Sequence, residues 1–396
     1  MSAAPVPAPP APIAVRAAVL EDVGGPLRVE TVELDPPGPG EVRVRVAAAG
    51  VCRSDLHVLH GTLPVPLPAV LGHEGAGIVE SVGPGVTRVR PGDPVVFNWV
   101  PGCGRCHYCR IGRPDLCDAA FDMQVSGTLP SGETRFRLGG RALHHFSGVS
   151  CMAEATVVPE AGVVPIPPGI PLERAALVGC AVTTGYGAVV HTAGVRPGTS
   201  VAVLGCGGVG LNVIQAARLA GAHPIIAIDV RPDKLALARR FGATHTVDAG
   251  RSEDVITPVL ELTDGLGADY AFEVIGRPET IAAAYGAVRK GGTAVVVGVA
   301  APHEEVAINA FSLPSQSKVL TGTWYGRSRP DVDIPRILAL VQAGRLDLDG
   351  LVSATVPLDA VGEALEALES GRAVRTVIRM GEAGDAGEAG DAAEGK

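Results

Sequence analysis

The sequence has 396 residues, of which 46% are apolar, and carries a formal net charge of −9 at pH 7. A chain of this length can bury a large core and form two or three domains, and its negative charge argues against binding to nucleic acids or anionic membranes. No apolar stretch reaches the ~18 residues of a membrane span, and the proline-rich start lacks the regions of a signal peptide. These features favour small-molecule chemistry in the cytoplasm, with no nucleic acid and no membrane as partner.

The order of the predicted elements indicates an α/β protein with two parts. Short strands broken by Gly and Pro fill residues 15–100, and the alternating stretch 41–49 is typical of a half-buried strand. Between residues 200 and 299, helical segments separate apolar strands that do not alternate, a pattern that predicts a parallel sheet covered by helices. Two further helices are predicted at residues 334–343 and 358–370.

A glycine-rich turn follows the first strand of the predicted parallel sheet and opens a helix, which is the context of a dinucleotide-binding fingerprint. The turn reads Gly205, Cys206, Gly207, Gly208, Val209, Gly210. Glycines let the backbone approach a pyrophosphate, whose charge the helix N-terminus stabilises. Asp229 ends the next strand, where a carboxylate would accept hydrogen bonds from the adenosine ribose and repel a 2′-phosphate. This pattern predicts NAD, although the nearby Arg231 leaves NADP open.

Four cysteines lie close together in a segment rich in Gly and Pro: Cys103, Cys106, Cys109 and Cys117. Four thiolates can close a tetrahedral shell around zinc and leave no open position for chemistry. An iron–sulfur cluster is the alternative, but the spacing lacks the ferredoxin pattern. We therefore predict a structural zinc ion in this segment.

Three further residues, Cys52, His73 and Cys180, could form a second metal site. Two cysteines and one histidine are an open zinc-ligand set, in which water or substrate takes the fourth position. Taken singly, each residue also fits an ordinary role as a buried thiol or a turn histidine. Their spacing alone therefore does not decide whether they bind a metal. Cys151 and Cys206 are interpreted as buried apolar residues.

Five ordered segments resemble those of the zinc-containing medium-chain alcohol dehydrogenases: GVCRSDLH, LGHEGAGIVESVGPGV, CGRCHYCRIGRPDLC, GCGGVG and FEVIGRPET. The resemblance runs from about residue 14 to residue 380. It implies NAD-linked oxidation of an alcohol with two zinc ions per chain, one catalytic on Cys52, His73 and Cys180 and one structural. It also implies a homodimer or homotetramer.

The same resemblance implies the fold class and its domains. A Rossmann domain with a doubly wound parallel sheet, residues 184–324, is inserted into a β-rich GroES-like catalytic domain. This catalytic domain comprises residues 15–183 and 325–381. Residues 1–14 and 382–396 are predicted to be a disordered leader and a disordered acidic tail.

The family's other functional positions match this sequence residue by residue. Ser54 matches the hydroxyl beside the alcohol and His57 the outer end of a proton relay, while Asp55 and Glu74 match acids near the catalytic metal. The remaining matches are cofactor contacts, Arg53, Lys234, Arg277 and Arg375, and positions that line the substrate pocket, Leu63, Trp99, Phe146, Ser147 and Trp324. Solvated charges, turn residues and core packing are the ordinary alternatives for these residues.

The long segment 118–149 resembles the loop of the alcohol and thiol-dependent formaldehyde dehydrogenase subgroups. Leu63 stands where the glutathione-linked enzymes carry an acid, which disfavours a glutathione adduct but leaves a mycothiol-type adduct open as an alternative substrate. A non-catalytic nucleotide-binding scaffold and a zinc-ribbon nucleic-acid binder are further alternatives. The presence of Cys52, His73 and Cys180 argues against a non-catalytic scaffold. The negative net charge argues against a nucleic-acid binder.

Overall fold

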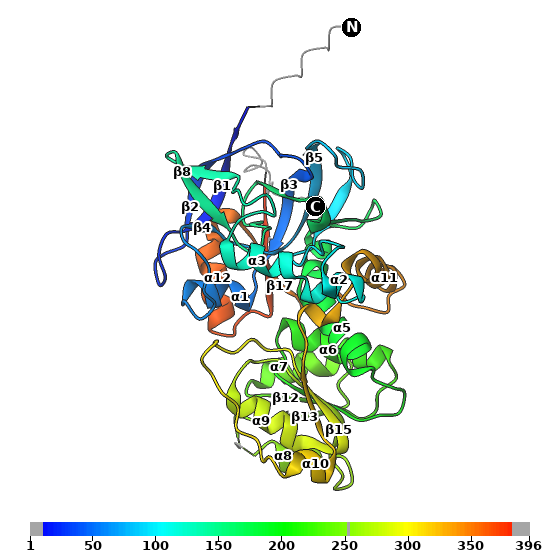
Figure 1. Cartoon of the computed structure of the whole chain (residues 1–396). Coiled ribbons are helices and arrows are strands. Elements are labelled where there is room, and N and C mark those ends of the chain that lie inside the picture. Colours follow the sequence, from blue (N-terminus) through cyan, green and yellow to red (C-terminus); the bar gives the residue numbers. More distant parts are fainter. Residues whose placement is uncertain (1–10, 252–253, 382–396) are drawn as a thin grey trace, which may run out of the picture.

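The computed structural model describes residues 11–251 and 254–381, which form two lobes (Figure 1). The upper lobe in that view contains segments from both ends of the chain, coloured blue, cyan and orange, and the lower lobe contains the green and yellow middle. The predicted tail and most of the predicted leader lie outside the described residues. The predicted leader ended at residue 14, but strand β1 already starts at Ile13.

The upper lobe contains a closed barrel and a mixed sheet. The barrel has the order β1 (Ile13–Leu20), β2 (Arg28–Leu34), β7 (Phe136–Leu138), β8 (Arg141–His145) and β4 (Ala69–Val70). The mixed sheet has the order β10 (Val163–Pro165), β6 (Pro94–Phe97), β5 (Glu74–Val82), β3 (Glu41–Gly50), β18 (Arg375–Arg379) and β17 (Val352–Pro357), with β9 (Ala155–Pro159) also paired to β3. Because β18 pairs with β3, the two ends of the chain share one sheet.

Strand β3 shows how the predicted alternation is modified by its neighbours. Arg43 and Arg45 are more exposed than the valines around them, as the alternating pattern predicts. The last residues of β3, from Ala48 to Gly50, are buried because β5 and β18 flank them. The chain leaves this enclosed end of β3 directly toward Cys52.

The lower lobe confirms the predicted parallel sheet. All its strands run parallel in the order β13 (His245–Asp248), β12 (Ile225–Asp229), β11 (Val201–Leu204), β14 (Ala268–Glu273), β15 (Val288–Val296) and β16 (Val319–Gly322). Successive side chains of β11 belong to two different apolar clusters, one for each face of the sheet. Val203 lies in the cluster that contains Leu211, and Ala202 lies in the cluster that contains Ala284. Burial on both faces explains why these strands do not alternate in sequence.

Helices cover the parallel sheet and complete the upper lobe. Those of the lower lobe are α6 (Gly208–Leu219), α7 (Pro232–Phe241), α8 (Ile256–Glu261), α9 (Pro278–Ala287) and α10 (Ser312–Gln316). Those of the upper lobe and its connections are α1 (Arg53–Leu59), α2 (His107–Arg110), α3 (Asp118–Ser126), α4 (Leu172–Ala175), α5 (Ala181–Gly187), α11 (Pro330–Gln342) and α12 (Val361–Glu369). Helix α11 begins before the predicted residue 334 because Pro330 presets the backbone of its first turn. Helix α12 follows a short 3₁₀ turn, Leu358–Ala360, at the predicted start.

Two chain segments connect the lobes and cross at close range. Helix α5 continues into the turn Ala188–Ala193, and the returning segment contains the turn Tyr325–Arg327. A Cβ atom at Gly187 would lie 2.2 Å from the carbonyl oxygen of Gly326, so only glycine allows this approach. Among the described helices, none is long and apolar enough by itself to cross a membrane. The two helices Leu172–Gly179 and Ala181–Ala193 reach the required length and apolar composition only when taken together, and they are bent relative to each other.

Candidate active site

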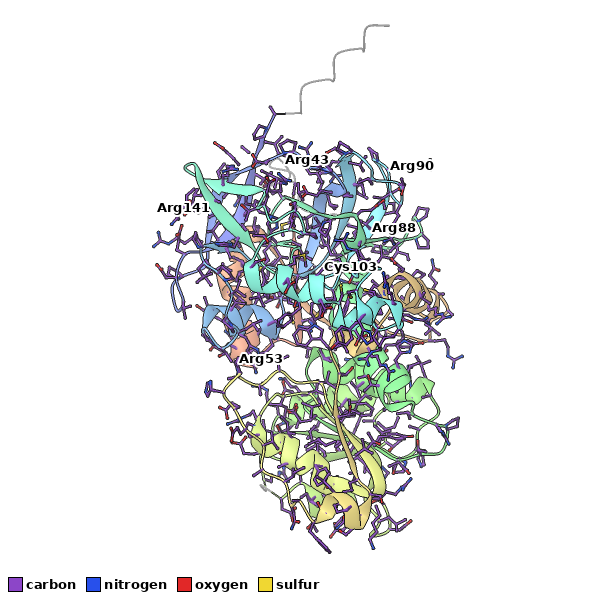
Figure 2. The ribbon with its side chains drawn as sticks, viewed as in Figure 1. Arg43, Arg53, Arg88, Arg90, Cys103 and Arg141 are labelled. Atoms are coloured by element: carbon purple, nitrogen blue, oxygen red, sulfur yellow. The ribbon has the colours of Figure 1, made fainter. Side chains whose placement is uncertain are left out.

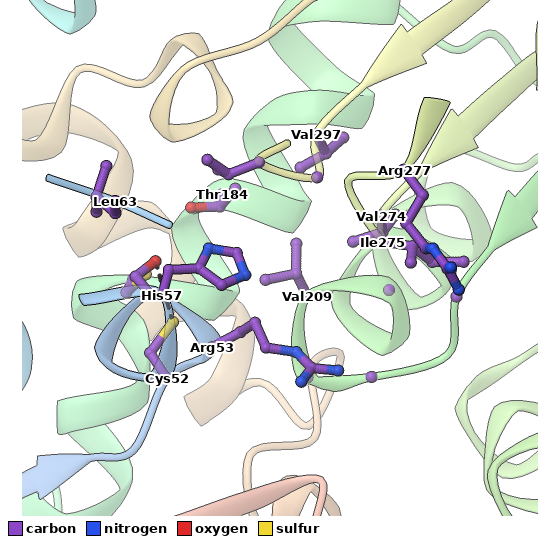
Figure 3. Close-up of a pocket in the computed structure, with 18 of the residues that line it drawn as sticks. Cys52, Arg53, His57, Leu63, Thr184, Val209, Val274, Ile275, Arg277 and Val297 are labelled. Carbon is purple, nitrogen blue, oxygen red and sulfur yellow. Dashed lines mark hydrogen bonds between the residues drawn. The ribbon is translucent and has the colours of Figure 1, made fainter. Parts of the chain in front are cut away.

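A cavity of about 1110 Å³ lies between the lobes and gathers the predicted site residues other than the four structural cysteines and two buried acids (Figure 3). Arg53 lies where the two lobes meet (Figure 2). The predicted residues that line the cavity are Cys52, Arg53, Ser54, His57, Leu63, His73, Trp99, Phe146, Ser147, Cys180, Gly205, Gly207, Gly208, Val209, Gly210, Asp229, Lys234, Arg277, Trp324 and Arg375. Asp55 and Glu74 are completely buried behind this lining.

The predicted catalytic ligands Cys52, His73 and Cys180 meet at the cavity although they are far apart in sequence. Cys52 precedes α1, His73 precedes β5, and Cys180 precedes α5, so each ligand lies at the start of a regular element. Their candidate ligand atoms all lie within 4.8 Å of one another, and all three residues are buried. A tetrahedral zinc ion separates two of its sulfur ligands by about 3.8 Å. The donor atoms and their spacing therefore fit zinc with one open position facing the cavity.

Asp55 supports two parts of this ligand set. Its carboxylate accepts hydrogen bonds from the backbone N–H groups of Cys52, at 2.9 Å, and of Gly72, at 3.3 Å. One carboxylate oxygen also lies 3.7 Å from Nδ1 of His73. The carboxylate therefore lies on the Nδ1 side of the ring without a hydrogen bond to it, and its charge there would favour Nε2 as the atom that binds a metal.

Glu74 and Arg375 form a buried charged pair beside the ligands. Glu74 Oε2 accepts a hydrogen bond from the N–H of Ala181 at 2.8 Å, and Oε1 lies 3.7 Å from Nε of Arg375. Burial raises the pKa of Glu74 to about 7, against the opposing effect of Arg375. Hydrogen bonding from Cys180, together with the charges of Arg375 and His73, lowers the pKa of Cys52 well below its ordinary value despite burial. This environment favours the thiolate that a metal requires.

Ser54 and His57 follow Cys52 on α1. Ser54 Oγ lies 3.8 Å from the sulfur of Cys52, and the His57 ring points from α1 into the cavity (Figure 3). Burial, and then the charge of Arg53, lowers the pKa of His57. A neutral imidazole at this place can accept a proton near neutral pH.

The four predicted structural ligands converge in a small lobe before α3. Candidate ligand atoms of Cys103, Cys106, Cys109 and Cys117 lie within 4.8 Å of one another, and the sulfurs of Cys106 and Cys117 are 3.9 Å apart. Backbone N–H groups of Cys103, Cys106 and Cys109 donate to neighbouring sulfurs at 3.3–3.5 Å. Such bonds stabilise thiolates, so this cluster also fits zinc.

The glycine-rich turn lies on the opposite side of the cavity, at the N-terminus of α6. Gly205 has φ +97°, and a Cβ at Gly210 would lie 1.9 Å from the Gly205 carbonyl oxygen, so these two glycines shape the turn. A Cβ at Gly207 would meet no atom within 4 Å and would project into open cavity. At Gly208 a Cβ would lie 2.5 Å from Nε of Arg375, which places that guanidinium against the helix start. The open space beside Gly207, with the start of α6 and the Arg375 guanidinium next to it, fits a pyrophosphate.

Asp229 lies at the end of β12 and lines the cavity. Its carboxylate accepts hydrogen bonds from the N–H groups of Cys206, at 2.8 Å, and Arg231, at 3.0 Å. The Arg231 side chain forms an ion pair with Asp233 at 3.1 Å and donates to the carbonyl of Ser370. It is therefore engaged away from the cavity, whereas Lys234 lines it.

Comparison with known proteins agrees with this geometry. Residues 38–168 match the alcohol dehydrogenase GroES-like domain, and residues 208–343 match the zinc-binding dehydrogenase domain. The chain is similar to an alcohol dehydrogenase zinc-binding domain protein from Burkholderia ambifaria, with 37% identity, a TM-score of 0.89, and coverage of 94% of this chain and 100% of that one. The chain belongs to the zinc-containing medium-chain dehydrogenase family.

Two other solved structures show the range of this family. Benzyl alcohol dehydrogenase from Acinetobacter calcoaceticus has 32% identity and a TM-score of 0.88, with coverage of 93% of this chain and 100% of that one. A putative zinc-binding dehydrogenase from Sinorhizobium meliloti 1021, solved with NADP bound, has 29% identity and a TM-score of 0.76, with coverage of 93% and 99%. The family is therefore established, whereas its subgroup stays a prediction.

Aromatic side chains of this dehydrogenase surround His73, the predicted metal ligand. The ring centroid of Phe146 lies 5.1 Å from that of His73, and the ring centroid of Trp99 lies 6.0 Å away, both in edge contacts. Trp324 packs 5.4 Å from Trp99. Together with Leu63 these residues give the part of the cavity nearest the predicted metal ligands an apolar wall.

Several residues that line the cavity were not predicted from the sequence. Thr184 and Tyr325 come from the two segments that connect the lobes, and Phe121, Gln124 and Val125 come from α3. The segment 118–149, interpreted from the sequence as a loop, contains α3 and the barrel strands β7 and β8. A periodic signal was hard to see in α3 because two of its apolar side chains, Phe121 and Val125, are exposed.

Proposed function

We propose that the protein is a zinc- and NAD-dependent alcohol dehydrogenase that interconverts an apolar primary, secondary or aromatic alcohol with its aldehyde or ketone. One observation carries the proposal. The open ligand set of Cys52, His73 and Cys180 faces the same cavity as the glycine-rich turn, so metal, substrate and nicotinamide can meet there.

When bound, zinc supplies a Lewis acid that lowers the pKa of the alcohol, and NAD supplies the hydride acceptor. The chain's own residues then handle the proton. Ser54 lies beside Cys52 and can accept the hydroxyl proton, while the neutral ring of His57 provides the next acceptor toward the outside of the cavity. The charge of Asp55 beside Nδ1 of His73 favours Nε2 as the metal-binding atom throughout.

NAD is favoured over NADP by the charges around Asp229. Its carboxylate is fixed by backbone N–H groups at the place of the adenosine ribose, where it would repel a 2′-phosphate. Arg231, the candidate partner for such a phosphate, is paired with Asp233 instead.

The substrate class follows from the apolar wall around His73. Trp99, Phe146, Trp324 and Leu63 offer few partners to a polar thiol adduct, which disfavours the mycothiol-type alternative. The name of the similar Acinetobacter calcoaceticus protein, benzyl alcohol dehydrogenase, supports an alcohol of this kind.

The decisive experiment is a steady-state screen of primary, secondary and aromatic alcohols with NAD and with NADP, together with formaldehyde in the presence and absence of low-molecular-weight thiols. We expect NAD-linked turnover of apolar alcohols without a thiol. Cys52→Ala should fold but abolish turnover. Strict thiol dependence, or unchanged turnover in Cys52→Ala, would contradict the proposal.

We also propose that the enzyme is cytoplasmic and forms a homodimer or homotetramer. The edge strand β16 pairs with β15 on one side, and the apolar side chains of Phe311, Leu313 and Val319 near this edge are exposed. An exposed apolar strand edge favours self-association. Analytical ultracentrifugation tests this part, and a monomer at micromolar concentration would contradict it.

A further inference from the structure

A buried carboxylate lies directly behind one wall of the cavity. Glu273 ends strand β14, and its side chain is completely buried. The two residues that follow it, Val274 and Ile275, line the cavity, and so does Val297, which follows β15 (Figure 3). A glutamate is almost never fully buried unless its carboxylate is paired, so the partners of Glu273 indicate its role.

One carboxylate oxygen of Glu273 holds the turn after β14 in place. Oε1 accepts hydrogen bonds from the backbone N–H groups of Ile275, at 2.9 Å, and Gly276, at 2.8 Å, and from the hydroxyl of Thr280, at 2.8 Å. Oε2 is also buried but has no hydrogen-bond partner among the described residues. Gly276 has φ +87°, a left-handed conformation that glycine adopts without strain. The carboxylate therefore fixes the course of this turn through three donors.

The backbone of Glu273 connects the same turn to the end of β15. Its carbonyl oxygen accepts hydrogen bonds from the N–H groups of Val297, at 2.8 Å, and Gly298, at 3.0 Å. A Cβ at Gly298 would lie 2.1 Å from the backbone nitrogen of Gly276, so the two turns are in backbone contact. Glu273 thus organises both turns of this wall, one through its side chain and the other through its carbonyl.

The order of the strands indicates which part of the cofactor meets this wall. Asp229, the candidate contact for the adenosine ribose, ends β12, and the glycine-rich turn for the pyrophosphate follows β11. Beyond β11, the next strands in the sheet are β14 and β15. A dinucleotide that lies across the carboxyl ends of these strands therefore places its nicotinamide half at the ends of β14 and β15.

Resting on the proposed dependence on NAD, we propose that Glu273 is a positioning residue that shapes the wall for the nicotinamide half of the cofactor. The residue acts through the turn that it holds, because its own carboxylate is buried behind the lining. Without it, the N–H groups of Ile275 and Gly276 lose their acceptor, and the wall is free to adopt conformations that do not bind the cofactor.

The test compares the binding of NAD with that of ADP, which has the adenosine and both phosphates but lacks the nicotinamide half. In Glu273→Ala, the Kd for NAD should rise by about tenfold or more, whereas the Kd for ADP should stay close to the wild-type value. Isothermal titration calorimetry measures both constants. Glu273→Gln keeps an oxygen acceptor and should recover most of the NAD affinity. If Glu273→Ala does not fold, Glu273→Asp, which withdraws the carboxylate by one methylene, replaces it with the same expected contrast.

Asp269, near the opposite end of β14, provides a matched control. Its carboxylate also accepts three hydrogen bonds, from the N–H and the hydroxyl of Ser200, both at 2.8 Å, and from Nε of Arg289 at 2.7 Å, but Asp269 does not line the cavity. Asp269→Ala should lower Tm and leave both Kd values unchanged. The inference is overturned if Glu273→Ala weakens NAD and ADP by the same factor, if it weakens neither, or if Asp269→Ala also weakens NAD selectively.

These titrations separate the inference from the proposed function, because binding does not require turnover. If the wild-type protein oxidises no alcohol, the proposed function fails, but a selective loss of NAD affinity in Glu273→Ala still supports the positioning role. If the wild-type protein oxidises alcohols with NAD and the variant loses affinity for both ligands equally, only the inference fails. A wild-type protein that does not bind NAD would overturn both.

Discussion

Gly207 offers a substitution that should separate cofactor binding from stability. Its backbone has φ −78°, which alanine adopts freely, and a Cβ there would meet no atom within 4 Å. Ala in place of Gly stabilises by about 0.4–1 kcal/mol through the unfolded chain, but alanine is a poorer N-cap by about 0.5–1 kcal/mol. These opposing effects nearly cancel, so the Tm of Gly207→Ala should remain close to the wild-type value.

Cofactor binding should respond differently, because the new methyl group fills the space where a pyrophosphate would approach the start of α6. Losing one charge-assisted hydrogen bond costs about 1.5–3 kcal/mol. The Kd for NAD should therefore rise by about 10- to 150-fold. Isothermal titration calorimetry with NAD and thermal unfolding of the same preparations measure both quantities.

Two other glycines serve as controls. Gly362, in α12, also has open space around a Cβ but lies away from the cavity, so Gly362→Ala should leave NAD affinity unchanged. Gly210→Ala should lower both Tm and NAD affinity, since its Cβ would collide with the Gly205 carbonyl. Unchanged NAD affinity in Gly207→Ala, or a loss of stability as large as that of Gly210→Ala, would refute the reasoning.

Three further predictions address the metals, the proton path and the cofactor. By elemental analysis, Cys109→Ala and Cys52→Ala should each retain one zinc ion per chain, but only Cys109→Ala should lower Tm substantially; loss of both zinc ions from either variant would contradict two independent sites. Because His57 accepts a proton only when neutral and its pKa lies below the ordinary 6.5, alcohol oxidation should persist below pH 6.5 and fall as the ring becomes charged. Arg53→Gln removes a charge that lowers this pKa, so the acidic limb of kcat/KM at saturating NAD should move to higher pH; an unshifted limb would exclude His57 as the titrating group. Asp229→Asn should raise the NADP-to-NAD ratio of kcat/KM by about thirtyfold. This is the effect of roughly 2 kcal/mol of repulsion between a carboxylate and a doubly charged phosphate at 4 Å in water, and an unchanged ratio would contradict the role of this carboxylate.

The sequence predicted those parts of the site whose chemistry restricts residue type. The ligands Cys52, His73 and Cys180 could be proposed because few residue types bind zinc, and the turn at Gly205 and Gly210 because close backbone approach excludes side chains. Their convergence could not be deduced from spacing alone. It depends on β3, β5 and the start of α5 meeting at one end of the mixed sheet, and the family resemblance supplied that information.

Helix α3 was missed for a physical reason. A helix in a globular protein is usually visible because one apolar face is buried, but Phe121 and Val125 are exposed and the buried positions are occupied by Ala120 and Met123. The resulting pattern has no clear apolar stripe. Only the folded structure shows that Cys117 places the helix beside the cavity and that Gln124 fixes it to Trp99.

The pairing of β18 with β3 has a consequence for biosynthesis. During translation, β3 and Cys52 leave the ribosome long before Arg375, whose side chain donates a hydrogen bond to the carbonyl of Val51. The parallel sheet of the lower lobe is made from one continuous stretch and can form in the nascent chain, but the mixed sheet must wait for residues 375–379. We therefore expect the polypeptide to acquire its nucleotide-binding half first and to become a competent enzyme only when synthesis is nearly complete.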